Sequence, residues 1–289
     1  MNPRLSPVFV KIMKPLDSLA AQFYHAFYEK EWPGGNGPGL STLSINEAYE
    51  VQRLVADLRV QSGERVVGYK VGCTSRAIRT QFGLSEPICG RLFHPHVQEE
   101  GIHLDWSAYA QCAIEPEMVM RMGRDLRGRD LSDQDLLDSI EYVSPGIEIH
   151  HFTFWHGKPT LQELICSGGI HAGLIVGREK VSPDHLRFGD ALFSVYKDHD
   201  LVTSAPATEI MGGPLDALRW LVRFLAARGD YLKKDSWVIP GSPTALVEVD
   251  QDTELKVVIE QVGQVVAHFR KEEVNNPVHP TVLRTASDH

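Results

Sequence analysis

The chain has 289 residues, enough to bury a large core as either one large domain or two small ones. Its 29 Lys and Arg residues against 38 Asp and Glu residues give a formal net charge of −9 at pH 7. That acidic balance, without any basic cluster, argues against a nucleic-acid-binding surface and favours small molecules as partners.

The cysteines and the apolar segments indicate the cellular compartment. The four cysteines are widely spaced and include no Cys-x-x-Cys pair, so we expect reduced thiols in a cytoplasmic protein and no zinc site. Lys11 and Lys14 interrupt the short apolar run near the N-terminus, and no segment approaches the ~18 apolar residues of a membrane helix. We therefore expect neither export nor a membrane partner.

Two helices are predicted at the N-terminus. Residues 16–30 have an amphipathic helical pattern, and the Gly- and Pro-rich stretch 33–39 ends it with a flexible, lid-like loop. Ser44 and Glu47 make a Ser-x-x-Glu capping box, after which apolar residues recur at helical spacing. We assign residues 1–63 to an N-terminal helical segment.

Beyond this segment, short apolar and β-branched stretches predict strands. The predicted strands are residues 66–71, 114–122, 147–149, 173–176, 192–196, 237–239, 246–249 and 255–259. Residues 198–200 and 263–264 have the composition of hairpin turns. One long helix interrupts the strands, with Pro214 in its first turn, an apolar stripe of leucines, and Gly229 at its end.

Strands and helices do not alternate regularly, so a doubly wound sheet is not expected. We predict an α+β fold in which a mixed sheet or rolled β-structure is flanked by helices. Residues 64–274 are assigned to this second domain. Residues 275–289, which include two prolines and have little to bury, are predicted to be a mobile tail.

Three glutamates within apolar, strand-like segments give the strongest functional signal. Side chains at i and i+2 share one face of a strand, so Glu115 and Glu117 project together while Pro116 faces the other way. Glu148 lies in the apolar run 147–149, where a partnered acid is expected more than a solvated one. Mg²⁺ or Mn²⁺ would relieve the repulsion between three carboxylates. A Glu-x-Glu pair is also common on a solvated face, and nothing local brings the third glutamate near.

A lysine between glycines is the second signal. Strand alternation places Lys70 on the same face as Gly68 and Gly72, whose missing side chains leave space for a ligand around the ammonium group. All three residues are therefore candidates for substrate binding. A lysine near a strand end is, however, often only solvated.

Together these motifs resemble the 2-keto-4-pentenoate hydratase and 4-oxalocrotonate decarboxylase family of the fumarylacetoacetate hydrolase superfamily. The resemblance covers most of the chain and rests on Gly-Tyr-Lys-Val-Gly at residues 68–72, Glu-Pro-Glu at residues 115–117, Glu148, and the helix start from Gly212, in this order. It implies a distorted mixed β-roll with flanking helices. It also implies Mg²⁺ or Mn²⁺ held by the three glutamates.

The resemblance further implies a metal-dependent hydratase of aromatic catabolism, which adds water to a 2-hydroxy-2,4-dienoate and gives a 4-hydroxy-2-oxo acid. Lys70 matches the family's active-site lysine. A metal chelated by a 2-oxo acid stabilises an enolate, which serves hydration and decarboxylation alike. Decarboxylation of 4-oxalocrotonate or oxaloacetate and hydrolysis of an acylpyruvate therefore stay open, as does a weakly active metal-binding subunit that supports a catalytic partner. We also expect a homo-oligomer.

The chain departs from the family pattern where many family hydratases have an aspartate and this chain has Ile88, which cannot transfer a proton. Glu86 is one candidate replacement, although an acid before Pro87 is also typical of a surface. His171 is the other candidate, because its free pKa lies near neutrality; the alternative is a structural histidine. No histidine is expected among the metal ligands, since hard cations favour oxygen.

Overall fold

A computed structural model of the chain describes residues 15–31, 40, 42–75, 79–80, 84–152 and 159–271. The predicted Gly- and Pro-rich loop and the predicted tail lie outside these residues. Among the described helices, none combines the length and the apolar character that crossing a membrane requires.

Two helices begin the described chain, as predicted: α1 (Pro15–Glu29) and α3 (Ile45–Gln61). The capping box is confirmed. The Ser44 side chain accepts a hydrogen bond from the Glu47 backbone N–H, and the Glu47 carboxylate accepts one from the Ser44 backbone N–H at 2.8 Å. This exchange satisfies two backbone donors at the start of α3 and fixes where the helix begins.

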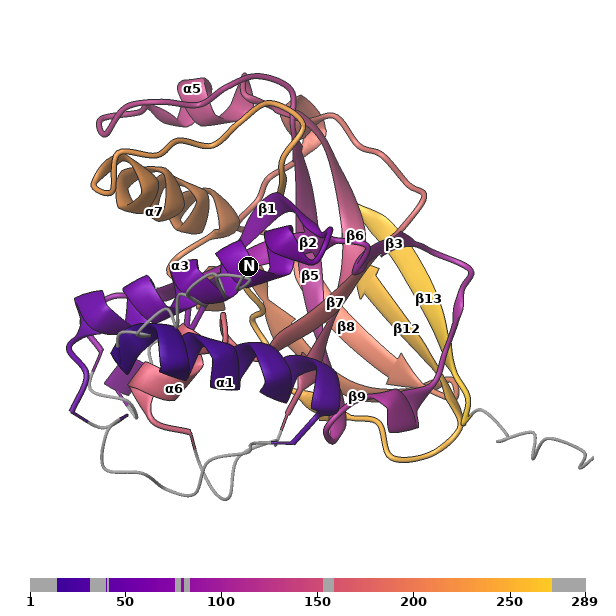
Figure 1. Cartoon of the computed structure of the whole chain (residues 1–289). Coiled ribbons are helices and arrows are strands. Elements are labelled where there is room, and N and C mark those ends of the chain that lie inside the picture. Colours follow the sequence, from indigo (N-terminus) through magenta and orange to yellow (C-terminus); the bar gives the residue numbers. More distant parts are fainter. Residues whose placement is uncertain are drawn as a thin grey trace, which may run out of the picture.

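The strands form two sheets (Figure 1). The larger sheet has the order β2-β1-β10-β5-β6-β7-β3, and β11 pairs with β5 beside this path. It is mixed, because β1 pairs with β10 and β3 pairs with β7 in parallel while the other pairs are antiparallel. Its strands are β1 (Arg65–Gly72), β2 (Ile88–His94), β3 (Val97–Glu99), β5 (Cys112–Met122), β6 (Ile140–His151), β7 (His171–Val176), β10 (Trp237–Ile239) and β11 (Val247–Glu248).

The smaller sheet has the order β4-β13-β12-β8-β9. Its strands are β4 (His103–Leu104), β8 (Leu192–Lys197), β9 (Asp200–Pro206), β12 (Thr253–Ile259) and β13 (Gly263–Phe269). The predicted hairpin turn between β8 and β9 is present, with Asp198 and His199 both at positive φ. Three 3-10 turns, η1 (Trp106–Ala108), η2 (Pro183–His185) and η3 (Ala207–Glu209), join these elements.

The larger sheet curls into a roll. A Cβ on Gly90 of β2 would lie 2.4 Å from the carbonyl oxygen of Gly168, just before β7, so strands distant in the sheet order approach each other. Buried apolar side chains from β2, β5, β7 and β10 fill part of the interior: Leu92, Val119, Leu174, Val176 and Ile239. The predicted α+β class with a mixed β-roll is confirmed.

Strand alternation divides β5 between two environments. Ile114, Met118 and Met120 face the main core, which the roll shares with the smaller sheet and with α7 (Pro214–Ala226). Val119 faces the interior of the roll. Glu115 and Glu117 have the same parity as Val119, so both point to the interior as well. The predicted helix with Pro214 at its start is thus confirmed as α7; the short α5 (Asp133–Leu137) lies beside it (Figure 1).

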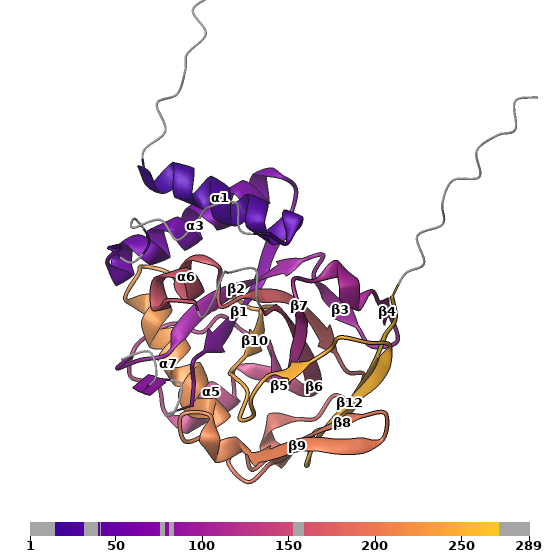
Figure 2. The same ribbon diagram turned by 90° about the horizontal axis from the view of Figure 1, so that it is seen from below.

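A helical layer covers the other side of the roll. α1, α3 and α6 (Leu161–Cys166) lie opposite β8, β9 and β12 (Figure 2). These helices share a buried cluster that includes Ile88 at the start of β2. Arg59 of α3 joins the layer to the roll, because its guanidinium lies 4.0 Å from the ring centre of Phe27 and 3.8 Å from that of Phe93.

Candidate metal centre

The β5–β6 register brings the three glutamates together. Glu115 pairs directly with Glu148 across the two antiparallel strands, and Glu117 pairs with Gly146 two residues along. Directly opposed residues have Cβ atoms about 4.5–5.5 Å apart, so the carboxylates of Glu115 and Glu148 share one space. Gly146 is required there, because a Cβ would lie 2.3 Å from Val119. Glu117 and Glu148 are fully buried, whereas the Glu115 side chain keeps 21% of its surface exposed.

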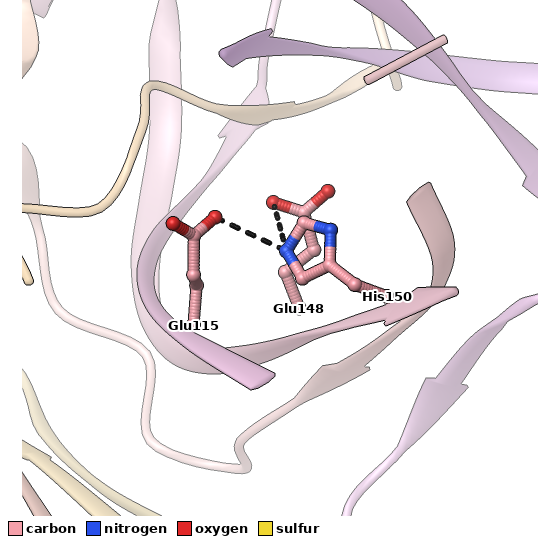
Figure 3. A group of neighbouring side chains, drawn as sticks. All are labelled: Glu115, Glu148 and His150. Atoms are coloured by element: carbon pink, nitrogen blue, oxygen red, sulfur yellow. Dashed lines mark hydrogen bonds and ion pairs between the residues drawn. The ribbon is translucent and has the colours of Figure 1, made fainter. Parts of the chain in front are cut away.

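Two histidines complete this cluster. His171, at the start of β7, places Nδ1 2.8 Å from Oε1 of Glu148. His150 of β6 places Nε2 3.1 Å from Oε2 of Glu115 and 3.6 Å from Oε2 of Glu148 (Figure 3). The ligand atoms of Glu115, Glu148 and His150 all lie within 4.8 Å of one another.

Lys70 of β1 lies in the same interior, as expected from its family match. Its ammonium is buried, 2.7 Å from Oε1 of Glu148, and donates a hydrogen bond of 3.3 Å to the Gly169 carbonyl. Lys70 is therefore part of the cluster and not a solvated lysine. Oε1 of Glu148 thus has two partners, Lys70 and His171.

Gly68 and Gly72 do not both leave the space beside Lys70 that the sequence predicted. A Cβ on Gly68 would lie 2.0 Å from the Trp237 carbonyl oxygen, so Gly68 allows the close approach of β10, and its predicted ligand space is wrong. A Cβ on Gly72 would lie 3.2 Å from Ile88 and 3.6 Å from Lys70, and substrate binding there stays a prediction. The backbone that crowds the lysine belongs to Gly90 and Gly169, which the sequence argument did not consider.

Unpaired buried atoms make the cluster a candidate cation site. Five buried side-chain atoms of the described residues have no hydrogen-bond partner, and four belong here: Glu117 Oε1, Glu148 Oε2, His150 Nδ1 and His171 Nε2. Each such buried group costs about 1–3 kcal/mol. Two of them are carboxylate oxygens, which a divalent cation would pair. Three ionised carboxylates and one ammonium also leave an excess of two negative charges, which one divalent cation would neutralise. The residues present therefore fit a divalent metal.

The pKa shifts of Glu117 and Glu148 also favour a bound cation. Burial and the nearby charges of Glu148 and Glu115 raise the pKa of Glu117 well above its usual range. Burial also opposes ionisation of Glu148, but Lys70 and the neighbouring histidines outweigh it, so the pKa of Glu148 lies below its usual range. Burial and mutual repulsion thus disfavour a second negative charge at Glu117 beside Glu148, and a bound cation would relieve that repulsion.

His171 and Glu86, the two candidate proton carriers, have different surroundings. His171 is buried, and burial lowers its pKa to about 4, so it is neutral at pH 7. A cavity of about 30 Å³ adjoins it, lined in part by Ser167 and Gly168. Glu86 is exposed, and no hydrogen bond or ion pair joins it to the cluster within the described part of the chain. The structure therefore gives Glu86 no place in this site.

His150 is the residue that the sequence argument missed. The signal was present, because Glu148 and His150 are two apart on one strand and share a face. We expected no histidine among the metal ligands because hard cations favour oxygen; the structure places a ring nitrogen of His150 within 4.8 Å of ligand oxygens of Glu115 and Glu148. That expectation considered only the chemistry of the ligand and not the strand position that places His150 beside Glu148.

No protein-family model matches the chain. A 4-oxalocrotonate decarboxylase from a Pseudomonas species is 31% identical over 226 residues, which cover 78% of this chain and 87% of that protein. A 2-keto-4-pentenoate hydratase from Paraburkholderia xenovorans is 26% identical over 235 residues, which cover 81% of this chain and 87% of that protein. Both alignments span most of the two chains compared.

Solved structures show the same fold. The 4-oxalocrotonate decarboxylase from Pseudomonas putida G7, complexed with magnesium and adipate, has a TM-score of 0.83 at 24% identity, over 88% of this chain and 97% of that one. A fumarylpyruvate hydrolase from Pseudomonas aeruginosa, in complex with Mn²⁺ and pyruvate, has a TM-score of 0.55 at 17% identity, over 71% of this chain and 89% of that one. The chain therefore belongs to the family of 2-keto-4-pentenoate hydratases and 4-oxalocrotonate decarboxylases.

Proposed function

We propose that this protein is a metal-dependent hydro-lyase that adds water to a 2-hydroxy-2,4-dienoate and forms a 4-hydroxy-2-oxo acid. The observation that carries the proposal is the buried cluster of Lys70, Glu115, Glu117 and Glu148 inside the roll of this family's fold. Relatives named 2-keto-4-pentenoate hydratase, 2-hydroxyhexa-2,4-dienoate hydratase and 2-oxo-hept-4-ene-1,7-dioate hydratase, at 24–26% identity, support it. Four free thiols agree with a cytoplasmic enzyme, and the homo-oligomer stays a prediction.

Glu115, Glu117 and Glu148 would hold Mg²⁺ or Mn²⁺, the ions that magnesium- and manganese-complexed structural neighbours suggest. When bound, such an ion supplies Lewis-acid polarisation of the substrate's 2-oxygen and carboxylate. The exposure of the three carboxylates indicates the side from which a substrate can approach. The exposed edge of Glu115 is the side from which a small acid can reach the cluster, because Glu117 and Glu148 are fully enclosed.

Lys70 would orient the substrate and stabilise negative charge. Its ammonium is held by Glu148 and Gly169 in a space without water exposure, and the carboxylates around it outweigh burial, so the pKa of Lys70 is raised. Lys70 therefore stays charged throughout the working pH range. A fixed buried cation can pair with a carboxylate or an enolate oxygen without reorganising, which is what an oxyanion needs.

His171 would move the proton that hydration requires. It is neutral at pH 7, Nδ1 is fixed by Glu148, and Nε2 is free of hydrogen bonds beside the small cavity. We expect His171→Asn to lower turnover by about 10² to 10⁴, the usual contribution of a general acid or base. Glu86→Gln, as the matched test of the other candidate, should leave turnover unchanged. Steady-state loss of dienol absorbance measures both, and a tenfold fall in Glu86→Gln would reinstate Glu86.

Decarboxylation is the second candidate, and Ile88 favours it. Ile88 is buried where many family hydratases have an acid, and its side chain lies beside Gly72. When CO₂ leaves, the electron pair of the broken C–C bond moves into the substrate and forms an enolate. This step requires no base at position 88. The relative of 31% identity is also a decarboxylase.

Product analysis separates the two candidates. The metal-loaded protein is given 2-hydroxypenta-2,4-dienoate and 4-oxalocrotonate in separate reactions, with dienol absorbance and CO₂ followed together. We expect a 4-hydroxy-2-oxo acid from the first substrate without CO₂. If the second substrate gives CO₂ and a shortened dienol while the first gives no product, the protein is a decarboxylase and not a hydratase. No turnover of either acid by the metal-loaded protein would leave a non-catalytic metal-binding subunit.

A further inference from the structure

We propose that His150 is a direct ligand of the metal, beside Glu115 and Glu148, and that the site therefore selects a first-row transition metal over Mg²⁺. This inference rests on the proposed metal dependence and deepens it, because it names a ligand and the class of ion that the ligand favours. It concerns a residue that the Glu-x-Glu and later-Glu pattern does not contain.

The positions of the three side chains carry the inference. Oxygen and nitrogen ligands lie about 2.1 Å from Mg²⁺ or Zn²⁺, so neighbouring ligand atoms around one ion are about 3.0–3.4 Å apart in octahedral or tetrahedral geometry. Nε2 of His150 lies 3.1 Å from Oε2 of Glu115 and 3.6 Å from Oε2 of Glu148. Figure 3 shows the imidazole turned so that this nitrogen faces both carboxylates. These separations need only small shifts to surround one ion.

An unpaired oxygen supplies the second, independent observation. The two oxygens of Glu148 have different surroundings: Oε1 accepts from Lys70 and His171, while the fully buried Oε2 has no hydrogen-bond partner. Oε2 is the oxygen that faces His150. A histidine present only to hydrogen-bond Glu115 would leave this buried oxygen unpaired, at a cost of about 1–3 kcal/mol. An ion held jointly by the three groups satisfies it.

The strand pairing explains how His150 reaches this position. Glu148 and His150 share the interior face of β6, and the β6–β7 register is irregular between Ile149 and His150. On the other side, His150 is paired with Ala113 of β5, whose methyl group leaves room for an imidazole. The ring can therefore lean diagonally toward Glu115, two residues along β5.

A nitrogen ligand changes which ion the site prefers. Mg²⁺ favours an all-oxygen shell, whereas imidazole suits later first-row ions such as Fe²⁺, Ni²⁺ and Zn²⁺, and affinity for first-row ions rises from Mn²⁺ along the Irving–Williams order. We therefore expect Co²⁺ to bind more tightly than Mn²⁺, and Mn²⁺ more tightly than Mg²⁺. Replacing the imidazole by an amide should narrow these differences.

Pulsed electron paramagnetic resonance of the Mn²⁺-loaded protein tests ligation directly. We expect a nitrogen hyperfine coupling that changes when histidine is labelled with ¹⁵N, a measurement that needs no substitution. The coupling should disappear in His150→Gln and persist in His151→Gln, whose histidine is equally buried but accepts a hydrogen bond from the Ala110 backbone instead. Absence of the coupling in the unmodified protein, or its survival in His150→Gln, overturns the proposal.

Ion selectivity provides the second measurement. Calorimetric titration with Co²⁺ and with Mg²⁺ should show that His150→Gln loses at least about 10-fold in Co²⁺ affinity and less in Mg²⁺ affinity. Equal losses for both ions would overturn direct ligation, because they would reflect a general disturbance of the site. The outcome is separable from that of the proposed function. Turnover without nitrogen coupling rejects only His150, whereas coupling without turnover rejects only the lyase.

Discussion

Glu148→Gln should remove most of the metal binding, with a fall in affinity of about 10² or more. Glu148 contacts the other groups of the centre through both of its oxygens. Oε1 lies within contact distance of Lys70 and His171, while Oε2, which has no hydrogen-bond partner, faces the proposed ion. Glutamine keeps the volume but removes the charge, so Lys70 becomes a buried cation without its nearest carboxylate. Breaking a buried pair in this way costs about 3–5 kcal/mol. We therefore also expect a lower free energy of unfolding in the metal-free protein.

Calorimetry with Mn²⁺ measures the first effect, and denaturant unfolding in the presence of a chelator measures the second. Glu141→Gln is the control, because Glu141 lies on the same strand but is exposed. Glu117→Gln offers a sharper comparison. Burial raises the pKa of Glu117, so its negative charge is disfavoured without metal; the neutral amide should therefore lower metal-free stability less than Glu148→Gln does, while still weakening metal binding. Full Mn²⁺ affinity in Glu148→Gln would show that the cluster is not the metal centre.

Local sequence patterns predicted the elements whose signals are complete within a few residues. The Ser44 capping box and the Pro214 start identified α3 and α7, and strand alternation placed Glu115 and Glu117 on one face. A similar signal was overlooked before α6, where Thr160 and Glu163 also form a capping box. Such signals suffice because the hydrogen bonds that they describe are made within one turn of chain.

Other elements depend on contacts that are distant in sequence. Ser144-Pro145-Gly146 has the composition of a turn, but β6 continues through it because these residues pair with Val119, Met118 and Glu117 of β5. β9 was missed as a strand because it is an exposed edge with no buried face to produce alternation. In both cases pairing with a neighbouring strand overrides the local preference.

The same limit applies to the site. Alternation predicted the direction of Glu115 and Glu117, but the pairing of Glu115 with Glu148 is set by the β5–β6 register, which only the fold, or a resemblance to a known fold, can supply. The space around Lys70 was predicted from its own strand, whereas Gly90 and Gly169 come from β2 and from the turn before β7. Neither neighbour could be found without knowing how the sheet curls.

Lys70→Met is the second large effect that we expect, with turnover lowered by about 10² or more. Methionine preserves the packing of a long side chain beside Gly90 and Gly169 but removes the only ammonium of the cluster. Metal affinity should stay the same or rise, because the substitution removes a positive charge 2.7 Å from Oε1 of Glu148. This combination distinguishes a role in orienting substrate or moving a proton from a role in building the metal centre.

Lys70→Arg tests whether charge alone is sufficient. The guanidinium keeps the charge but is planar and larger than an ammonium, and the close backbone of Gly90 and Gly169 leaves it little room, so we expect only partial recovery of turnover. Lys234→Met is the control for loss of a lysine, since Lys234 is exposed and its backbone N–H, not its ammonium, makes the contact with Asp125. Turnover and Mn²⁺ affinity are measured on the same samples. Unchanged turnover in Lys70→Met would mean that the buried ammonium only balances the carboxylate charge, because any role at the reacting atoms requires a donor that methionine lacks.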